Sequence, residues 1–236
     1  HCLSNFSFQR GASHPEELVT QAAAFGYAAI ALTDECSFAG IVRAHRALQA
    51  LPAADRPRLI IGSELQLADG PRIVLLATNR IGYGQLSRLI TQARRAAGKG
   101  EYRLTRDMID SLPGCLALLV PPPAFPPRSG IEAASAAVLA DAVWLTQRFP
   151  GRAWMTVTVR LDGRDRARIT WLRRIARAAG IPALAASAAL MHAPERRPLA
   201  DVMTALRLHC SVAEAGLALA ANAEQRLHDR DTLARR

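Results

Sequence analysis

Short apolar runs alternate with longer amphipathic stretches along most of the chain. The run Ala28–Leu32 lies between Gly26 and the polar cluster Thr33–Glu35, which is typical of a fully buried parallel strand. The positions from Phe38 to Gln49 then predict a helix. Because side chains at the carboxyl ends of such strands form the active sites of α/β folds, Thr33–Glu35 are candidate site residues.

The same alternation recurs further along. We predict strands at Arg58–Leu67, Arg72–Ala77, Cys115–Val120, Trp154–Arg160 and Ala183–Ala186. We predict helices at Tyr83–Ala97, Thr105–Ser111, Glu132–Phe149, Arg164–Ala179 and Pro198–Leu208. Strands alternate with helices at least five times, so the pattern predicts an α/β fold with a parallel sheet or barrel. We expect one domain over residues 1–216, followed by a tail over residues 217–236.

Three local signals mark the boundaries of elements. Ser13–Glu16 has the form of a capping box, in which Ser13 caps a helix and Glu16 reaches back to it. Ala68–Pro71 predicts a turn that joins two neighbouring strands. The five prolines of Pro121–Gly130 predict a surface loop.

The composition is that of a basic, globular chain. It has 236 residues, 50% of them hydrophobic, and a formal charge of +10 from 30 basic and 20 acidic residues. Lys99 is the only lysine, so the positive charge is almost all arginine. Such a surface suits a polyanion such as DNA, but an arginine- and alanine-rich composition can also reflect codon bias. We weigh these two explanations equally.

The cysteines and the apolar runs indicate a cellular compartment. Cys2, Cys36, Cys115 and Cys210 form no Cys-x-x-Cys pair, which argues against a structural zinc site or a disulfide framework and fits a reducing cytoplasm. No apolar run is long enough for a membrane span, and no signal peptide is present, so we expect a cytoplasmic protein without membrane contact. The chain begins at His1, and we expect it to be a segment of a longer protein.

Most familiar catalytic motifs are missing. Gly98-Lys99 lacks the other residues of a phosphate-binding loop, and no serine-hydrolase elbow is present. Polar groups do occur at three successive strand ends: His1 with Ser4, Asp34 with Glu35, and Glu64. This layout is usual for a metal-dependent hydrolase in a barrel mouth.

Several stretches resemble the polymerase-and-histidinol-phosphatase (PHP) domain, in one order over essentially the whole chain. These are His1–Ser4, Ala31–Asp34 and Gly62–Glu64. Leu75–Asn79 and Ala200–Arg207 resemble that domain in bacterial C-family DNA polymerases, and Asn5–Pro15, Thr33–Ser37 and Leu190–His192 resemble the error-prone, damage-inducible branch. The resemblance implies a distorted parallel β/α barrel of about seven strands, with residues 217–236 leading toward a polymerase palm.

The resemblance fails at the metal ligands. Active PHP domains place His-x-His on the first strand, an Asp in the following loop, a His after Thr-Asp, and a late Asp-x-His. The corresponding residues here are Leu3, Arg10, Glu35, Ala188 and Leu190. The resemblance therefore implies a degenerate metal site with three remaining candidate ligands, His1, Glu64 and Asp34, too few for a cluster of two or three metal ions.

Each surviving residue also has a structural explanation, which we favour. His1 can be a hydrogen-bonded residue at a strand end. Glu64 and Asp34 can belong to a buried polar network that includes an ion pair with Arg10, because a buried carboxylate needs a partner. We expect His45, His209 and His228 on the surface and leave His192 open.

Three functions remain. The leading hypothesis is a non-catalytic PHP domain at the amino end of an error-prone DNA polymerase that acts in translesion synthesis, with no catalytic residue in this segment. The resemblance implies DNA, the downstream polymerase domains, the sliding clamp and mutagenesis-complex accessory proteins as partners. No cofactor is expected here, and magnesium is expected only for the polymerase region beyond this chain. The alternatives are a free-standing metal-dependent PHP phosphoesterase and an arginine-rich DNA-binding scaffold without a polymerase.

Overall fold

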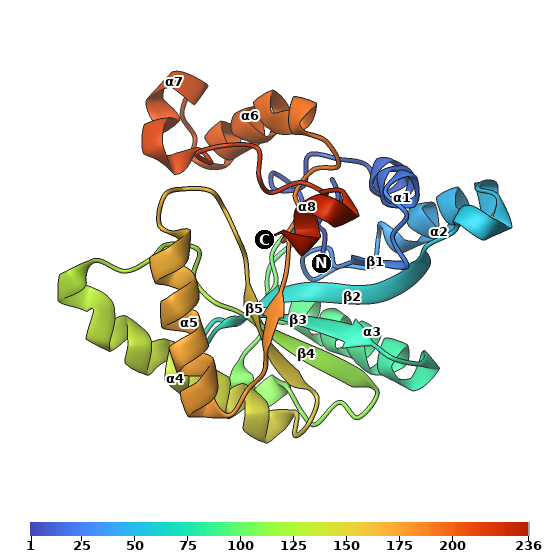
Figure 1. Cartoon of the computed structure of the whole chain (residues 1–236). Coiled ribbons are helices and arrows are strands. Elements are labelled where there is room, and N and C mark those ends of the chain that lie inside the picture. The colour runs from blue at the N-terminus through green and yellow to red at the C-terminus, as the bar shows by residue number, and fades with distance from the viewer. Residues whose placement is uncertain (236) are drawn as a thin grey trace. The chain divides into compact units, whose positions relative to one another are not determined.

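The structure, a computed structural model, describes residues 1–235 and divides them into two compact units. The first unit holds His1–Ile61, Val159–Asp162 and the described residues from Ser187 onward. The second unit holds Gly62–Thr158 and Gly163–Ala186. Six strands are hydrogen-bonded to their neighbours in the order β1-β2-β3-β4-β5-β6 (Figure 1). Strand β2 (Arg58–Gln66) begins in the first unit and ends in the second.

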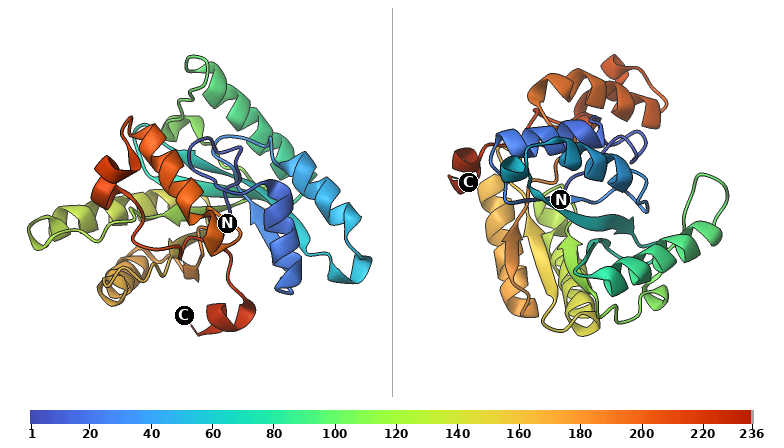
Figure 2. Two further views of the ribbon diagram at one scale, coloured as in Figure 1. Left: turned by 90° about the horizontal axis from the view of Figure 1, so that it is seen from above. Right: turned by 90° about the vertical axis from the view of Figure 1, so that its right-hand side faces the viewer.

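The first unit is built mainly from helices around a short parallel ladder. Its longer elements are α1 (Pro15–Ala24), β1 (Ala29–Leu32), α2 (Ile41–Ala50) and α6 (Arg197–Arg207). Its short helices are η1 (Ala53–Asp55), η4 (Pro194–Arg196), α7 (Val212–Ala215), η5 (Gly216–Ala218) and α8 (Arg230–Ala234). β1 pairs in parallel with the start of β2, from Ala29 opposite Arg58 to Leu32 opposite Ile61. Helices α1 and α2 pack against each other (Figure 2).

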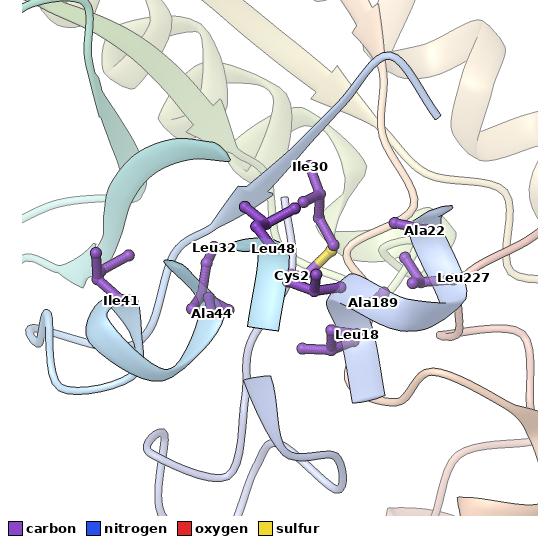
Figure 3. Close-up of a cluster of buried hydrophobic side chains, with 11 residues drawn as sticks. Cys2, Leu18, Ala22, Ile30, Leu32, Ile41, Ala44, Leu48, Ala189 and Leu227 are labelled. Carbon is purple, nitrogen blue, oxygen red and sulfur yellow. The ribbon is translucent and has the colours of Figure 1, made fainter. Parts of the chain in front are cut away.

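The core of this unit gathers residues from both ends of the sequence. Leu18 and Ala22 from α1 meet Ile30 and Leu32 from β1, and all four are at most 4% exposed (Figure 3). The remaining members are Cys2, Val19, Ile41, Ala44, Leu48, Ala189 and Leu227. Burial of this apolar surface holds the amino-terminal segment and the carboxyl-terminal part of the chain together.

The second unit carries most of the sheet. After β2 it contains β3 (Arg72–Ala77), α3 (Arg80–Arg95), η2 (Arg106–Met108), β4 (Cys115–Val120), η3 (Arg128–Gly130), α4 (Ile131–Arg148), β5 (Ala153–Val157), α5 (Asp165–Ala179) and β6 (Ala183–Ala185). β3 pairs antiparallel with both β2 and β4, whereas β4, β5 and β6 pair in parallel. The apolar strand residues Ile73, Leu75 and Leu119 are almost completely buried.

The predicted α/β class is confirmed, and the pairing shows why the sheet is mixed. The turn Ala68–Pro71 is far shorter than the dozen or so residues that a parallel crossover needs, so β2 and β3 must run antiparallel. We also expected His1–Ser4 to be the end of a first strand, but this segment forms only isolated bridges, from Cys2 to Leu32 and to Ala189. The strand predicted at Trp154–Arg160 is β5 and ends earlier, at Val157.

The predicted capping box was wrong by one residue. Helix α1 is capped at His14, whose backbone N–H donates to a Glu17 carboxylate oxygen at 2.8 Å. The Ser13 hydroxyl is instead engaged by His192, whose backbone N–H donates to it at 2.8 Å. Ser13 therefore makes a long-range hydrogen bond to His192 and does not cap the helix, as the local sequence pattern would suggest.

Two residues near the end of the described chain are buried in the first unit. Leu227 and His228 are each only 1% exposed, and the Tyr27 hydroxyl donates to the His228 carbonyl at 2.5 Å. The division into a domain over 1–216 and a tail over 217–236 stays a prediction. None of the helices in the described part of the chain combines the length and the apolar character that a membrane crossing requires.

Candidate functional site

Asp34 follows the carboxyl end of β1 and is sealed from solvent. The residue is 2% exposed. Its Oδ1 atom accepts hydrogen bonds from the Ser4 backbone N–H and the Ser7 hydroxyl, each at 2.7 Å. Its Oδ2 atom accepts from the Ser4 hydroxyl, also at 2.7 Å. Both carboxylate oxygens are therefore engaged by donors from the loop that follows Cys2 and Leu3.

Backbone pairing of the amino-terminal segment explains this arrangement. The Cys2 N–H donates to the Ala31 carbonyl at 3.0 Å, and the Thr33 N–H donates to the Cys2 carbonyl at 2.9 Å. The Leu3 N–H donates to the Ala189 carbonyl at 2.9 Å on the other side. The backbone at Cys2 and Leu3 is thus hydrogen-bonded to β1 and Thr33 on one side and to Ala189 on the other. This pairing places Ser4 next to Asp34.

Glycine makes room for the Asp34 carboxylate. A Cβ atom on Gly40 would lie 2.6 Å from Asp34 Oδ2 and 3.1 Å from Ser4 Oγ. A Cβ atom on Gly11 would lie 1.9 Å from the Ser4 carbonyl oxygen, inside any permitted contact. The loop and the start of α2 therefore approach Ser4 and Asp34 as closely as backbone allows.

Two opposing effects act on the charge of Asp34. Burial raises the pKa of Asp34 above its ordinary value, and the hydrogen bonds from Ser4 and Ser7 oppose that shift. The three donors satisfy a carboxylate, as a buried carboxyl group requires. We call Asp34, Ser4 and Ser7 the Asp34 cluster.

Arg10 and Glu35 form an ion pair beside this cluster. Arg10 Nη1 lies 2.6 Å from Glu35 Oε2, and the two side chains are 15% and 26% exposed. The Glu35 backbone N–H also donates to the Ser7 hydroxyl at 2.9 Å, which links the pair to the Asp34 cluster. From the sequence, we expected a buried polar network around Glu64 and Asp34 that included an ion pair with Arg10. The network around Asp34 exists, and Arg10 forms an ion pair with Glu35 beside it.

Glu64 belongs to the second unit. It lies in β2 opposite Val74 of β3 and is 3% exposed. Arg72 Nε lies 3.4 Å from Glu64 Oε1, so the buried carboxylate has a positive neighbour on the adjacent strand. Arg72 is paired with Gln66, two residues further along β2 than Glu64. Arg72 and Glu64 are therefore diagonal neighbours on the same face of the sheet.

The donor set around Asp34 does not fit a metal ion. His1 is partly exposed, and its carbonyl accepts from the Ala189 N–H at 3.2 Å. The position two residues later is Leu3, an apolar side chain that is 2% exposed. Within residues 1–235, no three His, Cys, Asp or Glu side chains gather as a metal site. The assignment of His1, Glu64 and Asp34 as remnant ligands stays a prediction.

The other histidines divide into buried and exposed. His228 was predicted on the surface, and this was wrong: it is 1% exposed, with Nε2 3.0 Å from the Glu224 carbonyl and 3.6 Å from the Glu224 carboxylate. His192 Nδ1 lies 2.8 Å from Ser13 Oγ. Burial lowers the pKa of His192 below its ordinary value, which the nearby Glu17 partly opposes. His45 and His209 are exposed, as expected.

Comparison with known proteins establishes the family. The PHP domain model matches residues 1–120, slightly more than half of the chain. The chain belongs to the PHP domain family. An amidohydrolase from Chromobacterium violaceum, solved with bound sulfate and no metal, shares the fold with a TM-score of 0.51 and 17% identity, over 80% of this chain and 85% of that one.

Relatives of this PHP domain are similar along its whole length. An error-prone DNA polymerase from Aromatoleum aromaticum is 57% identical over 238 residues and is matched by 100% of this chain. One from Methylococcus capsulatus is 48% identical over 237 residues, again with 100% of this chain. The chain spans about a fifth of these relatives, 21% of each.

The sequence patterns found some members of the site and missed others. They pointed to Asp34, Ser4 and Glu64, because each follows or lies in a predicted strand. They did not assign Ser7 or Gly40, although Ser7 is part of a stretch that resembles the family. Only the folded loop shows that the Ser7 hydroxyl reaches Asp34.

Proposed function

We propose that this PHP domain is part of an error-prone DNA polymerase and that the segment itself does not catalyse a reaction. The observation that carries the proposal is the identity of 48–57% to two error-prone DNA polymerases over the entire chain. The similarity extends over the full length of this chain. It therefore supports a common parent protein as well as a common fold.

The proposal that the segment is not catalytic rests on its side chains. Arg10 and Glu35 stand at two positions where active members of the family carry metal ligands. Their opposite charges form an ion pair, with Arg10 Nη1 2.6 Å from Glu35 Oε2. A guanidinium group stays protonated and cannot become a ligand. The oxygens of Asp34 accept three hydrogen bonds. The domain would then act as a structural support for the neighbouring polymerase domains.

The parent protein would add nucleotides opposite damaged template in translesion synthesis. It would use magnesium in the polymerase region beyond this chain, and no cofactor would be bound here. Its partners would be DNA, the sliding clamp and the accessory proteins of a mutagenesis complex, in the cytoplasm. The net charge of +10 supports a place for this domain near DNA.

Primer extension by the native polypeptide that contains this chain tests the proposal. On a primed template with an abasic site, the native polypeptide with magnesium should insert a nucleotide opposite the lesion and extend the primer. The 236-residue chain alone should do neither. A native polypeptide of about the length of this chain, or one that incorporates no nucleotide on undamaged template, would contradict the proposal.

A variant in the Asp34 cluster provides the matched control. In the native polypeptide, Asp34→Ala should lower the unfolding temperature but leave the rate of incorporation per folded molecule unchanged at low temperature. This result separates a supporting role from a catalytic one, because a catalytic carboxylate would reduce the rate in the folded protein.

A further inference from the structure

A groove in the second unit runs along α5. It has a volume of about 550 Å³ and lies between the first half of α5, the proline-rich loop and the start of α4. The side chains that shape it are Phe125, Ile131, Arg166, Thr170, Trp171 and Arg174. Helices α4 and α5 lie side by side next to this loop (Figure 1).

One wall of the groove is positively charged. Arg166, Thr170 and Arg174 are spaced by four residues, so they share one side of α5, and all three are exposed. No hydrogen bond or ion pair of the Arg166 or Arg174 side chain is found in the described part of the chain. Asp165, the only acidic residue of α5, is paired with the buried Arg168. The two guanidinium groups are therefore available to bind an anionic ligand.

Two aromatic side chains, Phe125 and Trp171, also line the groove. Phe125 and Trp171 meet edge to face, with ring centroids 5.9 Å apart and ring planes at 83°. The Trp171 indole N–H donates to the Ser135 hydroxyl at 2.8 Å, which fixes that ring against α4. Trp171 is 6% exposed, whereas Phe125 in the loop is only partly buried. Phe125 is thus partly exposed in the groove that the arginines line, and it packs against the hydrogen-bonded Trp171 ring.

We propose that this groove binds single-stranded nucleic acid, with phosphates on Arg166 and Arg174 and a base on Phe125. Exposed arginines beside an aromatic ring form the arrangement that binds single strands, because guanidinium groups bind phosphates and the ring stacks on a base. The inference deepens the proposed function, on which it rests for its choice of DNA as the physiological ligand.

The spacing of the arginines selects a strand over a small anion. Arg166 and Arg174 are eight residues apart, which is about 12 Å along the helix axis. A ligand that contacts both carries at least two separated phosphates, as an oligonucleotide does. An acidic peptide would also satisfy the charges, but it would leave Phe125 without a stacking partner, so a strand fits the groove better.

Fluorescence anisotropy of a labelled 12-nucleotide oligo(dT) tests the groove, with the full 236-residue chain. The double variant Arg166→Ala/Arg174→Ala should weaken binding at least tenfold. It should also reduce the slope of log K against log salt by about 1.4, since each phosphate contact on a single strand contributes roughly 0.7. The matched control is Arg88→Ala/Arg95→Ala, two exposed arginines on α3, which removes the same charge and should change binding less than threefold.

The aromatic contact has its own test. Phe125→Ala should weaken binding of the single strand on the order of tenfold, the usual loss for one stacked base. It should leave binding of a 12-base-pair duplex unchanged, because paired bases are not available for stacking. Phe8→Ala, an 82% exposed phenylalanine in the first unit, is the control and should have no effect. Circular dichroism melts of all variants exclude loss of fold as the cause.

Several results would overturn the inference. Equal losses in the two arginine double variants would mean that DNA binding is spread over the surface. Tighter binding of polyglutamate than of oligo(dT) would assign the groove to an acidic protein. Absence of any oligo(dT) binding would remove the ligand altogether. In each case primer extension by the native polypeptide could still succeed, so failure of this inference is distinguishable from failure of the proposed function.

Discussion

The Asp34 cluster and the groove along α5 (the α5 groove) differ in the burial and the hydrogen bonding of their polar side chains. Asp34 is 2% exposed, and three hydrogen bonds from Ser4 and Ser7 occupy its oxygens. Arg166 and Arg174 are exposed, and no partner for either is found within residues 1–235. The polar atoms of the cluster are satisfied by the protein itself, whereas those of the groove are available to a ligand.

Under the proposed function, this difference is the one expected when a family's metal site becomes a structural element. A buried carboxylate is costly without partners, so a chain that loses metal ligands must supply other neighbours for those that remain. Here serine donors surround Asp34, and Arg10 and Glu35 compensate each other. Polar groups that face solvent are under no such constraint. Binding function is therefore expected in the groove and stability in the cluster.

The largest effect should come from removing the Asp34 carboxylate. Asp34→Ala leaves three buried donors without an acceptor, and we expect it to lower the free energy of unfolding by about 3 kcal/mol. Urea denaturation measures the loss. Asp34→Asn, which keeps one acceptor oxygen, should cost less. Free energies within about 0.5 kcal/mol of wild type for both variants would show that the cluster is not structural.

A smaller loss should follow from filling the space beside Asp34. Gly40 has φ −76°, so alanine fits the backbone there, but its Cβ atom would lie 2.6 Å from Asp34 Oδ2. We expect Gly40→Ala to cost about 2 kcal/mol through crowding. Gly84→Ala in α3 is the control, because nothing lies near its Cβ position. It should be neutral or stabilising by up to about 1 kcal/mol. A stable Gly40→Ala protein would mean that the carboxylate can move freely.

The ion pair between Arg10 and Glu35 should couple more weakly. Both side chains are partly exposed, so solvent screens their attraction, and we expect a coupling free energy of about 0.5–1 kcal/mol. A double-mutant cycle with Arg10→Ala, Glu35→Ala and the double variant measures it. Zero coupling would indicate that the two replacements do not compensate each other.

The smallest effect on stability should come from the groove. Arg166→Ala and Arg174→Ala remove exposed side chains, so each should change the free energy of unfolding by less than about 0.5 kcal/mol. Thermal melts of the two single variants beside Asp34→Ala test the contrast directly. A loss comparable with that of Asp34→Ala would mean that the groove arginines serve the fold rather than a ligand.

Much of the fold could be predicted from local pattern. The apolar run that ends at Leu32 and the amphipathic stretches produced the strands and helices, because the period of hydrophobic positions is a local property. The turn Ala68–Pro71 was predicted to join two neighbouring strands, but the sheet was expected to be parallel, whereas this pair is antiparallel. The burial of His228 could not be foreseen, because it depends on Glu224 and Tyr27, and the contact to Tyr27 joins residues 201 positions apart.

The candidate site was predictable in part for the same reason. Asp34 was identified because it follows a buried strand, and a polar network around it was expected. The partner of Arg10 was not, since Arg10 and Glu35 are brought together by a loop of irregular backbone. The α5 groove could not be predicted, because it is lined by a proline-rich loop and by a helix that is distant from it in the sequence. In addition, nothing in the sequence distinguishes the arginines of α5 from the other arginines of the chain.

Metal content and hydrolysis by the 236-residue chain test the central claim most directly. The claim is that a hydrogen-bonded cluster now stands where active PHP domains hold metal ions. Elemental analysis after purification in zinc and manganese should give fewer than two ions per chain. An assay with a labelled oligonucleotide and a phosphomonoester should show no cleavage, because hydrolysis by two metals needs both ions firmly held. Two or more bound ions, with cleavage that His1→Ala abolishes, would contradict the account.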